Sequence, residues 1–399
     1  MARIGIFGGS FNPPHLGHVL AAEEFREKLG LDRLLLVPAA VPPHKALSAN
    51  APSAEARLEM TRLAVRELPY AAVSNLELRR AGPSYTVDTL AALREKYPND
   101  ELILLMGTDM LLAFADWYQP ERILQLASLA VAHRGKDRLD ELTACAADLK
   151  QRFGGKVTLV GNRCLPYSST SVRAMLAFGC GEDYLAPAVY DYILQNRLYY
   201  TGRDLTGLPM EQLREVGLSL LKPQRVAHVI GCSETAAALA AHYGANVTNA
   251  ARAGALHDVT KALTAEEQLK LCEKYGMILN QFDRSHAKLL HAKTGAAVAR
   301  RIFGENEAVC AAIEWHTTGR AGMTLLEKII YLADYIEPNR DFDGVEELRR
   351  LTWTDLDAAM LLGLTMTMHH LNKTESEIGP DSLAAYRSFQ AGAADRKGS

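Results

Sequence analysis

Short apolar runs and amphipathic stretches alternate along the first half of the chain. Six apolar runs bounded by polar or turn residues predict buried strands, at 3–7, 33–40, 71–78, 101–107, 128–134 and 156–161. Stretches with apolar residues at helical spacing lie between them, for example at 17–30, 53–68 and 86–97. Strands that alternate with helices predict crossover connections. This half is therefore expected to form an α/β domain, with a parallel sheet and helices on both faces.

The pattern changes beyond residue 200, where only helical periodicity remains. Eight segments are typical of helices, at 210–220, 223–243, 248–257, 264–275, 285–303, 307–316, 323–336 and 355–371. Glycine, threonine and proline interrupt the apolar pattern at 199–209. These features predict one domain at 1–203, a linker at 204–209, an all-α domain at 210–390 and a frayed, disordered tail at 391–399.

Length, composition and charge narrow the class of protein. A chain of 399 residues is long enough for two or three domains. Its 48% hydrophobic and 23% charged residues and its net charge of −3 indicate a globular protein, with no sign of binding to nucleic acid or an anionic membrane. No apolar run approaches the roughly 18 residues of a membrane span, and the first strand starts too early for a signal peptide. Six scattered cysteines without a C-x-x-C pair indicate reduced thiols. We expect a cytoplasmic protein, and the sequence leaves the formation of homo-oligomers open.

The first strand runs into an unusual turn, "GGSFNPPHLGH", at residues 8–18. Gly8 and Gly9 permit a tight turn and a close approach of a ligand to the backbone, and Ser10 adds a further backbone contact. His15 and His18 are three residues apart at the start of the following helix, where free N–H groups and the helix dipole favour an anion. The pattern predicts a phosphate-binding loop. The alternative is a pair of loop histidines that only cap the helix.

A second anion site is predicted in "SSTSVR", at residues 168–173. Ser169 and Thr170 stand where a new helix starts, with Arg173 on its first turn. By itself this stretch is also an ordinary helix N-cap.

These two stretches, together with "GPSYTVDTL" (82–90) and "GTDMLLAFADWY" (107–118), resemble a known family in their order and combination. The first resembles the signature of the Rossmann-like nucleotidyltransferase superfamily. All four together resemble the bacterial nicotinate-nucleotide adenylyltransferases, over residues 1–200. The resemblance implies transfer of AMP from ATP to nicotinate mononucleotide, which gives nicotinate adenine dinucleotide and pyrophosphate. The alternative is another mononucleotide acceptor, such as pantetheine phosphate, which "SYTVDTL" and "ADWY" disfavour.

The same resemblance implies roles for individual residues. No protein nucleophile is needed, so His15, His18 and Arg173 would act by positioning and charge stabilisation. The ATP and phosphate contacts would come from Gly8, Gly9, Ser10, Lys45, Gly107, Asp109, Ser169 and Thr170. The nicotinate mononucleotide pocket would be lined by Thr86, Trp117 and Tyr118, with Trp117 stacked on the pyridine ring. Mg²⁺ would arrive with ATP, because no carboxylate cluster forms a dedicated site. The family has "GAD" where this chain has "GTD". We expect His44 and His133 to be structural.

Histidines concentrate in the second half, which holds eight of the twelve. His257 and Asp258 are adjacent in "AGALHDVTKAL", a pair that suits a metal approaching a helix from one side. Other candidate ligands lie on other predicted helices: His228, His291, His316 and Asp334. Four histidines and two aspartates are enough for one or two metal ions in a helical core. A lone His-Asp pair would more commonly be a surface feature.

Residues 216–375 resemble the HD superfamily of metal-dependent phosphohydrolases. "LHDVTK", "LLHAKTGA", "HTTGRAGMTLLEKIIYLADYIEPNR" and "GVEELR" are similar to the YqeK-like bacterial hydrolases, which cleave diadenosine tetraphosphate symmetrically to two ADP. The resemblance implies two divalent metals, with iron expected, held by His228, His257, Asp258, His291, His316 and Asp334. It makes Asp258 both ligand and catalytic residue, and assigns the polyphosphate to Arg225, Lys261 and Arg320.

The resemblance has one local departure, and it leaves two alternatives open. Ala292 and Lys293 stand where the family has Gly-Pro, so Lys293 is a candidate for altered phosphate access. His286 is either a group that supports a metal ligand or an exposed residue, and His369 and His370 are expected on the surface. The alternatives for this half are a nucleotide-sensing or interaction module without catalysis, and a hydrolase of another phosphate ester.

Overall fold

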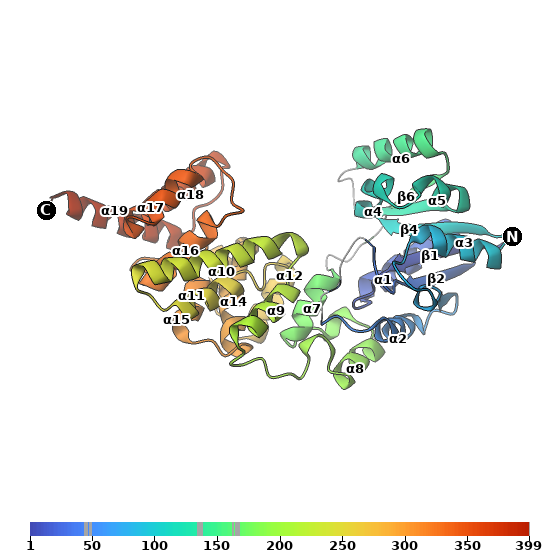
Figure 1. The fold of residues 1–399 in the computed structure, drawn as a ribbon, viewed down its shortest axis with the longest axis horizontal. Coiled ribbons are helices and arrows are strands. Elements are labelled where there is room, and N and C mark those ends of the chain that lie inside the picture. Colours follow the sequence, from blue (N-terminus) through green and yellow to red (C-terminus); the bar gives the residue numbers. More distant parts are fainter. Residues whose placement is uncertain (44–46, 48–49, 134–138, 162, 164–167, 399) are drawn as a thin grey trace. The chain divides into compact units, whose positions relative to one another are not determined.

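The computed structural model describes residues 1–43, 47, 50–133, 139–161, 163 and 168–398. It contains two compact units, Met1–Gly202 and Arg203–Ser399 (Figure 1). The division falls one residue before the predicted end of the first domain. Lys45 and His44 lie outside the described residues.

The first unit is built on a six-stranded parallel sheet with the order β3-β2-β1-β4-β5-β6. Each predicted strand is present, which confirms the α/β expectation. β3 is much shorter than predicted because the chain turns away at Ser74 and forms a 3₁₀ helix at Glu77–Arg79. The strands are β1 (Arg3–Gly9), β2 (Arg33–Pro38), β3 (Ala71–Val73), β4 (Glu101–Gly107), β5 (Ser128–His133) and β6 (Val157–Gly161).

Helices cover both faces of this sheet. Along β2 the side chains alternate between two apolar cores, with Leu34 and Leu36 in one and Leu35 and Val37 in the other. The first core includes side chains of α1 and α2, and the second includes side chains of α3, α4, α5 and α6. The helices of this unit are α1 (Leu16–Leu29), α2 (Ala54–Val65), α3 (Thr86–Lys96), α4 (Thr108–Leu112), α5 (Pro120–Leu126), α6 (Leu139–Phe153), α7 (Ser169–Ala177) and α8 (Pro187–Gln195).

The second unit is helical throughout its described residues, as predicted. Its helices are α9 (Met210–Ser219), α10 (Pro223–Tyr243), α11 (Val247–Leu256), α12 (Ala265–Lys274), α13 (Gln281–Ser285), α14 (Leu290–Arg301), α15 (Glu307–Glu314), α16 (Leu325–Ile336), α17 (Val345–Thr352), α18 (Leu356–Lys373) and α19 (Pro380–Gly398). The sequence analysis did not identify α13, α17 or α19. It also predicted one helix at 285–303, where the chain instead forms a 3₁₀ turn at Ala287–Leu289 followed by α14.

The C-terminal segment differs from the predicted disordered tail. Helix α19 begins at Pro380, whose fixed φ suits a first helical position, and continues to Gly398. Alanines, which favour helix, recur along it at 384, 385, 391, 393 and 394. In the part of the chain that the structure describes, no helix combines the length and apolarity needed to cross a membrane.

Candidate functional sites

A cavity of about 680 Å³ lies at the carboxyl ends of the strands in the first unit. The ends of β1 and β4 contribute Gly8, Gly9 and Gly107 to its wall, where ligands bind in sheets of this kind. It brings together eight of the residues predicted from the sequence: Gly8, Gly9, Ser10, His18, Thr86, Gly107, Asp109 and Trp117. The predicted phosphate loop and the predicted pyridine pocket therefore share one cavity.

The two histidines of the loop lie at the N-terminus of α1. His15 is the N-cap, and its backbone N–H donates to Nδ1 of His18 at 3.0 Å. Burial lowers the pKa of His18 to about 4, and burial together with the His18 charge lowers the pKa of His15 well below its ordinary value. Both rings are therefore neutral near pH 7. Because Nδ1 of His18 is an acceptor, its ring proton is on Nε2, and the ring can donate a hydrogen bond into the cavity that it lines.

Helix α7 is joined to the same loop. Ser169 Oγ donates to the backbone oxygen of Pro13 at 3.3 Å, and Arg173 Nη1 donates to that of Asn12 at 2.9 Å. Arg173 Nη2 also donates to Thr170 Oγ1 at 3.3 Å. Arg173 is the fifth residue of α7, because Ser168 is the N-cap, so it starts the second turn and not the first as predicted. The two predicted anion-binding stretches are thus neighbours.

The predicted mononucleotide pocket is only partly assembled on the cavity wall. Thr86 is the first residue of α3, and Trp117 packs against Phe114 with ring centroids 5.3 Å apart. Tyr118 is not among the described residues that line the cavity. It is 50% exposed, with its ring 4.6 Å from that of Tyr85.

Sequence reasoning missed two buried charged residues beside this cavity. Glu77 lines the cavity and is 7% exposed, and Thr89 Oγ1 donates to it at 2.7 Å. Arg57, on α2, is 1% exposed. The available signal was spacing, because Arg57 falls three and four residues before the buried Met60 and Thr61.

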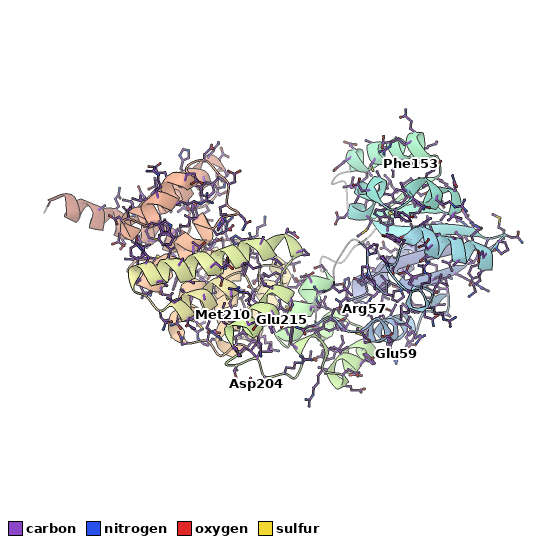
Figure 2. All side chains as sticks on the ribbon, viewed as in Figure 1. Arg57, Glu59, Phe153, Asp204, Met210 and Glu215 are labelled. Carbon is purple, nitrogen blue, oxygen red and sulfur yellow. The ribbon has the colours of Figure 1, made fainter. Side chains whose placement is uncertain are left out.

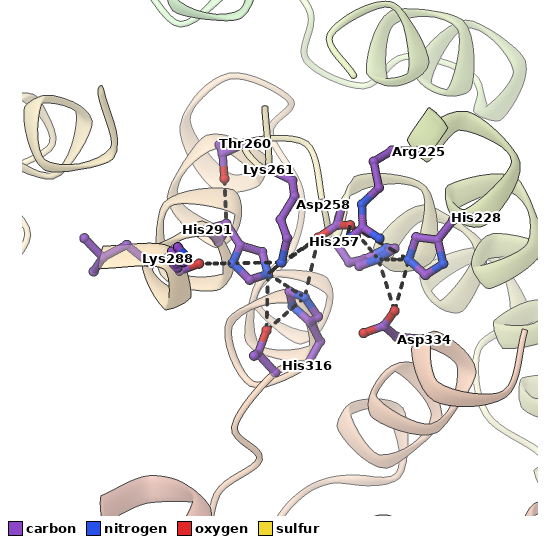
Figure 3. A network of polar contacts seen from close by, with 12 residues as sticks. Arg225, His228, His257, Asp258, Thr260, Lys261, Lys288, His291, His316 and Asp334 are labelled. Carbon is purple, nitrogen blue, oxygen red and sulfur yellow. Dashed lines mark hydrogen bonds and ion pairs between the residues drawn. The ribbon is translucent and has the colours of Figure 1, made fainter. Parts of the chain in front are cut away.

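In the second unit, five helical regions bring the six predicted metal ligands together (Figure 3). His228 lies on α10, His291 on α14 and Asp334 on α16. The other three lie just beyond helix ends: His257 is the C-cap of α11, Asp258 follows it, and His316 follows the C-cap of α15. The predicted ligand pair therefore stands at a helix C-terminus and not within a helix.

The carboxylate of Asp258 lies between two groups of ligand atoms. Its Oδ2 is 3.8 Å from His228 Nε2 and 3.7 Å from His257 Nε2. Its Oδ1 is 3.5 Å from His291 Nε2 and 3.9 Å from His316 Nε2. Asp334 Oδ1 adds to the first group, at 3.0 Å from His228 Nε2 and 3.8 Å from His257 Nε2. The arrangement offers two donor sets that share one carboxylate.

The outer nitrogens of the four histidines orient these donor sets. Each Nδ1 faces an acceptor: Glu337 Oε1 for His228 (3.0 Å), Gly254 O for His257 (2.7 Å), Lys288 O for His291 (2.8 Å) and Ile313 O for His316 (2.7 Å). A proton held on Nδ1 leaves the lone pair of Nε2 facing inward, as a metal requires. The Nε2 atoms of His228 and His257 are 3.3 Å apart. Their lone pairs would repel each other at this distance, and a cation bound to both would relieve the repulsion. The donor set therefore fits divalent metals that accept imidazole and carboxylate.

Charged side chains surround the candidate metal centre. Arg225 Nη2 is 2.6 Å from Asp258 Oδ2, Arg340 Nη2 is 2.5 Å from Asp334 Oδ1, and Lys261 Nζ is 2.9 Å from His291 Nε2. Burial disfavours the ionised form of Asp258, but the neighbouring His257 and Lys261 charges outweigh it and hold its pKa below the ordinary value. Burial also lowers the pKa of His291 to about 3 and that of His316 to about 4, so these two ligands are neutral.

Not every predicted residue joins this network. Arg320 donates to the buried Glu327 at 2.8 Å, at the N-terminus of α16. Lys293 donates to both oxygens of Asp283, at 2.7 and 2.9 Å, so its ammonium is engaged by a carboxylate. His286 stacks on Phe282, with centroids 4.1 Å apart. His369 and His370 are exposed on α18, as predicted.

Glu337 and Arg340, in the stretch "YIEPNR", also belong to the centre, although no role was predicted for them. Glu337 is fully buried and accepts hydrogen bonds from Asn339 N and Nδ2, both at 2.8 Å, besides its contact with His228. The available signal was a glutamate three residues after the candidate ligand Asp334, at the end of an apolar helical run.

Comparison with known proteins finds separate matches in the two units of the chain. Residues 6–175 match the cytidylyltransferase-like family model, and residues 225–339 match the HD domain model. The chain is 41% identical over 210 residues to a "probable nicotinate-nucleotide adenylyltransferase" of Aeromonas salmonicida, covering 50% of this chain and 97% of that protein. It is 45% identical over 198 residues to one of Thermus thermophilus, covering 49% and 99%. A crystal structure of a "predicted HD superfamily hydrolase involved in NAD metabolism" from Clostridium acetobutylicum is similar at 34% identity, covering 46% of this chain and 98% of that one, with a TM-score of 0.45.

Proposed function

The chain belongs, through its first unit, to the nicotinate-nucleotide adenylyltransferase family, and we propose that this unit joins ATP and nicotinate mononucleotide into nicotinate adenine dinucleotide and pyrophosphate. The observation that carries this proposal is that one cavity is lined by Gly8, Ser10 and His18 together with Thr86 and Trp117. Such a cavity can hold a triphosphate and an aromatic mononucleotide together.

The chemistry proposed for this cavity needs positioning more than covalent catalysis. A phosphate oxygen of the mononucleotide attacks the α-phosphorus of ATP, and pyrophosphate leaves. The Nε2–H of His18, which lines this cavity, would donate to the phosphates as negative charge moves toward the leaving group. Gly8 and Gly9 let the phosphates approach the backbone, and Mg²⁺ bound to ATP would neutralise part of their charge.

The test is a product assay with the full chain, ATP and Mg²⁺, in which nicotinate mononucleotide and nicotinamide mononucleotide compete. We expect nicotinate adenine dinucleotide as the main product, separated by chromatography. Equal use of the two would contradict the assignment of Thr86 and Trp117 to the mononucleotide pocket. Product only from another phosphate acceptor, such as pantetheine phosphate, would contradict the substrate.

For the second unit, which contains an HD domain, we propose a YqeK-like hydrolase that cleaves diadenosine tetraphosphate into two ADP. The observation that carries it is Asp258, whose two oxygens face two different pairs of histidines. His228, His257 and Asp334 would hold one metal and His291 and His316 the other, with Asp258 shared and iron the expected metal. When bound, such a metal pair supplies hydroxide near neutral pH and polarises a phosphoryl oxygen.

The chain's own charges suit a polyphosphate. Three carboxylates (Asp258, Asp334 and Glu337) face three cations (Arg225, Lys261 and Arg340). Two divalent ions would therefore make the centre strongly positive. Arg225 and Lys261 are partly exposed and can turn from Asp258 to the substrate phosphates.

The test combines metal analysis with product identity. The purified protein, loaded with Fe²⁺, Mn²⁺ or Co²⁺, is expected to release only ADP from diadenosine tetraphosphate. ATP plus AMP would contradict symmetrical cleavage while leaving a phosphohydrolase. Hydrolysis of another phosphate ester alone would contradict the substrate. Nucleotide binding without turnover under any metal would favour the sensing module.

A further inference from the structure

Arg57 is a buried cation at the edge of the transferase cavity. It lies on the buried face of α2, whereas Glu59 on the same helix is partly exposed (Figure 2). Within the described residues, no carboxylate lies at ion-pair distance from its guanidinium. Burial lowers the pKa of Arg57, but an arginine side chain remains charged at any physiological pH. A buried charge without a carboxylate partner is costly unless its N–H groups donate hydrogen bonds to other acceptors.

Its Nη nitrogens donate to backbone carbonyls of two segments that line the cavity, and its Nε donates to Pro52 O, just before its own helix, at 3.4 Å. Nη1 donates to Ser10 O at 2.8 Å and to Ala39 O at 2.7 Å, and Nη2 donates to Ala40 O at 3.0 Å. Ser10 belongs to the phosphate loop after β1, and Ala39 belongs to the segment after β2. The planar guanidinium therefore fixes the spacing between these two segments.

The segment after β2 is also tied to the mononucleotide side of the cavity. Ser84 Oγ accepts from Ala40 N at 3.0 Å and from Val41 N at 3.3 Å, and Ser84 N donates to Val41 O at 2.9 Å. Ser84 stands two residues before Thr86, and both line the cavity. A continuous set of hydrogen bonds thus runs from the phosphate loop through Arg57 and residues 39–41 to the start of α3.

We propose that Arg57 is a positioning residue that sets the register between the two substrates of the transferase. This inference rests on the proposed transfer reaction, in which two phosphates must meet in line. Loss of Arg57 removes the side-chain link at Ser10 and leaves only the backbone bond from Ala39 N to Gly9 O, at 2.9 Å, between the phosphate loop and the segment held by Ser84. Each substrate still finds its own contacts, but the distance between the reacting atoms is less tightly fixed. The expected kinetic signature is a fall in kcat with little change in either KM.

The test compares Arg57→Met and Arg57→Lys with Arg62→Met in the full chain. Arg62 lies on the exposed face of α2 and pairs with Glu59 at 3.1 Å, so its variant controls for charge loss and helix propensity. We expect Arg57→Met to lower kcat by roughly 10²-fold with each KM within about threefold of wild type. Arg57→Lys, which keeps the charge but loses the fork, should fall between. Calorimetric binding of a non-hydrolysable ATP analogue counts folded sites, and thermal melting reports stability.

Further outcomes distinguish a positioning role of Arg57 from a purely structural one and from failure of the proposed transfer reaction. In a further variant, Arg57→Ala, guanidinium ion at millimolar concentration should restore part of the kcat per binding site at an unchanged number of binding sites, whereas rescue of folding alone would raise the number of sites. A kcat per binding site equal to that of Arg62→Met would overturn the inference, and so would a rise in one KM at constant kcat. If Arg57→Met does not fold, Arg57→Lys decides by the same criteria. Failure of wild type to form any dinucleotide would instead overturn the proposed function together with this inference.

Discussion

The contact between Glu337 and His228 permits a quantitative prediction about metal affinity. In Glu337→Gln the side chain keeps its shape but loses its charge. Oε1 accepts from His228 Nδ1 at 3.0 Å, and Oε2 accepts from two N–H groups of Asn339 at 2.8 Å. An amide has one oxygen for these two sets of donors. Its NH₂ group must therefore face either His228 Nδ1–H or the Asn339 donors, and one buried donor is left without an acceptor.

The expected cost follows from the loss of one hydrogen bond that supports a ligand. Removal of such an outer partner lowers metal affinity about 10–100-fold, which corresponds to about 1.4–2.7 kcal/mol. The same size is expected for a hydrogen bond to a charged group, at ~1.5–3 kcal/mol. Hydrolysis should fall at limiting metal and recover at excess metal, because the ligands themselves remain in place.

The assay is a competition between the protein and a chelator of known affinity, read as metal bound per chain. Glu305→Gln is the matched control, because Glu305 is a buried glutamate that pairs with Arg252 and not with a predicted ligand. The reasoning is refuted if Glu337→Gln binds metal as tightly as this control, or if excess metal fails to restore turnover in a folded variant.

Four further predictions address the two units. His18→Ala should lower transferase kcat by roughly 10²-fold without unfolding the chain, as for loss of a preorganised donor; near-normal turnover would exclude the phosphate role. Asp258→Ala, or chelation, should abolish hydrolysis and leave adenylyl transfer unchanged once Mg²⁺ is supplied; a parallel loss of transfer would mean that the sites depend on each other. Residues 1–203 alone should be folded and active, which soluble expression and the product assay check; an inactive, unfolded fragment would place the boundary elsewhere. The pKa of the His18 imidazole is about 4 in the folded state and about 6.5 in the unfolded chain. As the pH falls, His18 is therefore protonated in the unfolded fragment before it is protonated in the folded one. Its free energy of unfolding should therefore fall as pH drops from about 6.5 to 4, with a shallower fall in His18→Ala, measured by urea titration.

Much of the fold could be predicted because its signals are local in the sequence. The β2 run is apolar at consecutive positions, since Leu34 and Leu35 face opposite cores, and such a run is typical of a parallel strand covered on both sides. Helix α13 was not predicted because it has five residues and its start depends on a capping box between Asn280 and Asp283. Short helices of this kind lack a full apolar period.

The residues of the candidate sites also differ in whether their signals are local in the sequence. His18 and Asp258 could be found because their residue types and neighbours already suggest chemistry. Arg57 could not, because its Nη nitrogens donate to backbone oxygens 47, 18 and 17 positions away, and a carbonyl carries no sequence signature. Tyr118 is the opposite case, a residue that was predicted in the site but does not line it. The family resemblance implied that it lines the pocket, but its ring packs on Tyr85.

The position of β1 within the sheet has a consequence for motion. β1 is hydrogen-bonded to β2 on one edge and to β4 on the other, so its amides are among the last to reach solvent. Hydrogen exchange at Ile6 and Phe7 should then require unfolding of the whole unit. The phosphate loop is therefore anchored at one end to one of the slowest-exchanging parts of the unit. Its other end is held as well, because Phe11 and Asn12 are buried and Asn12 O accepts from Arg173, so the loop offers a substrate a preformed surface that does not have to close around it.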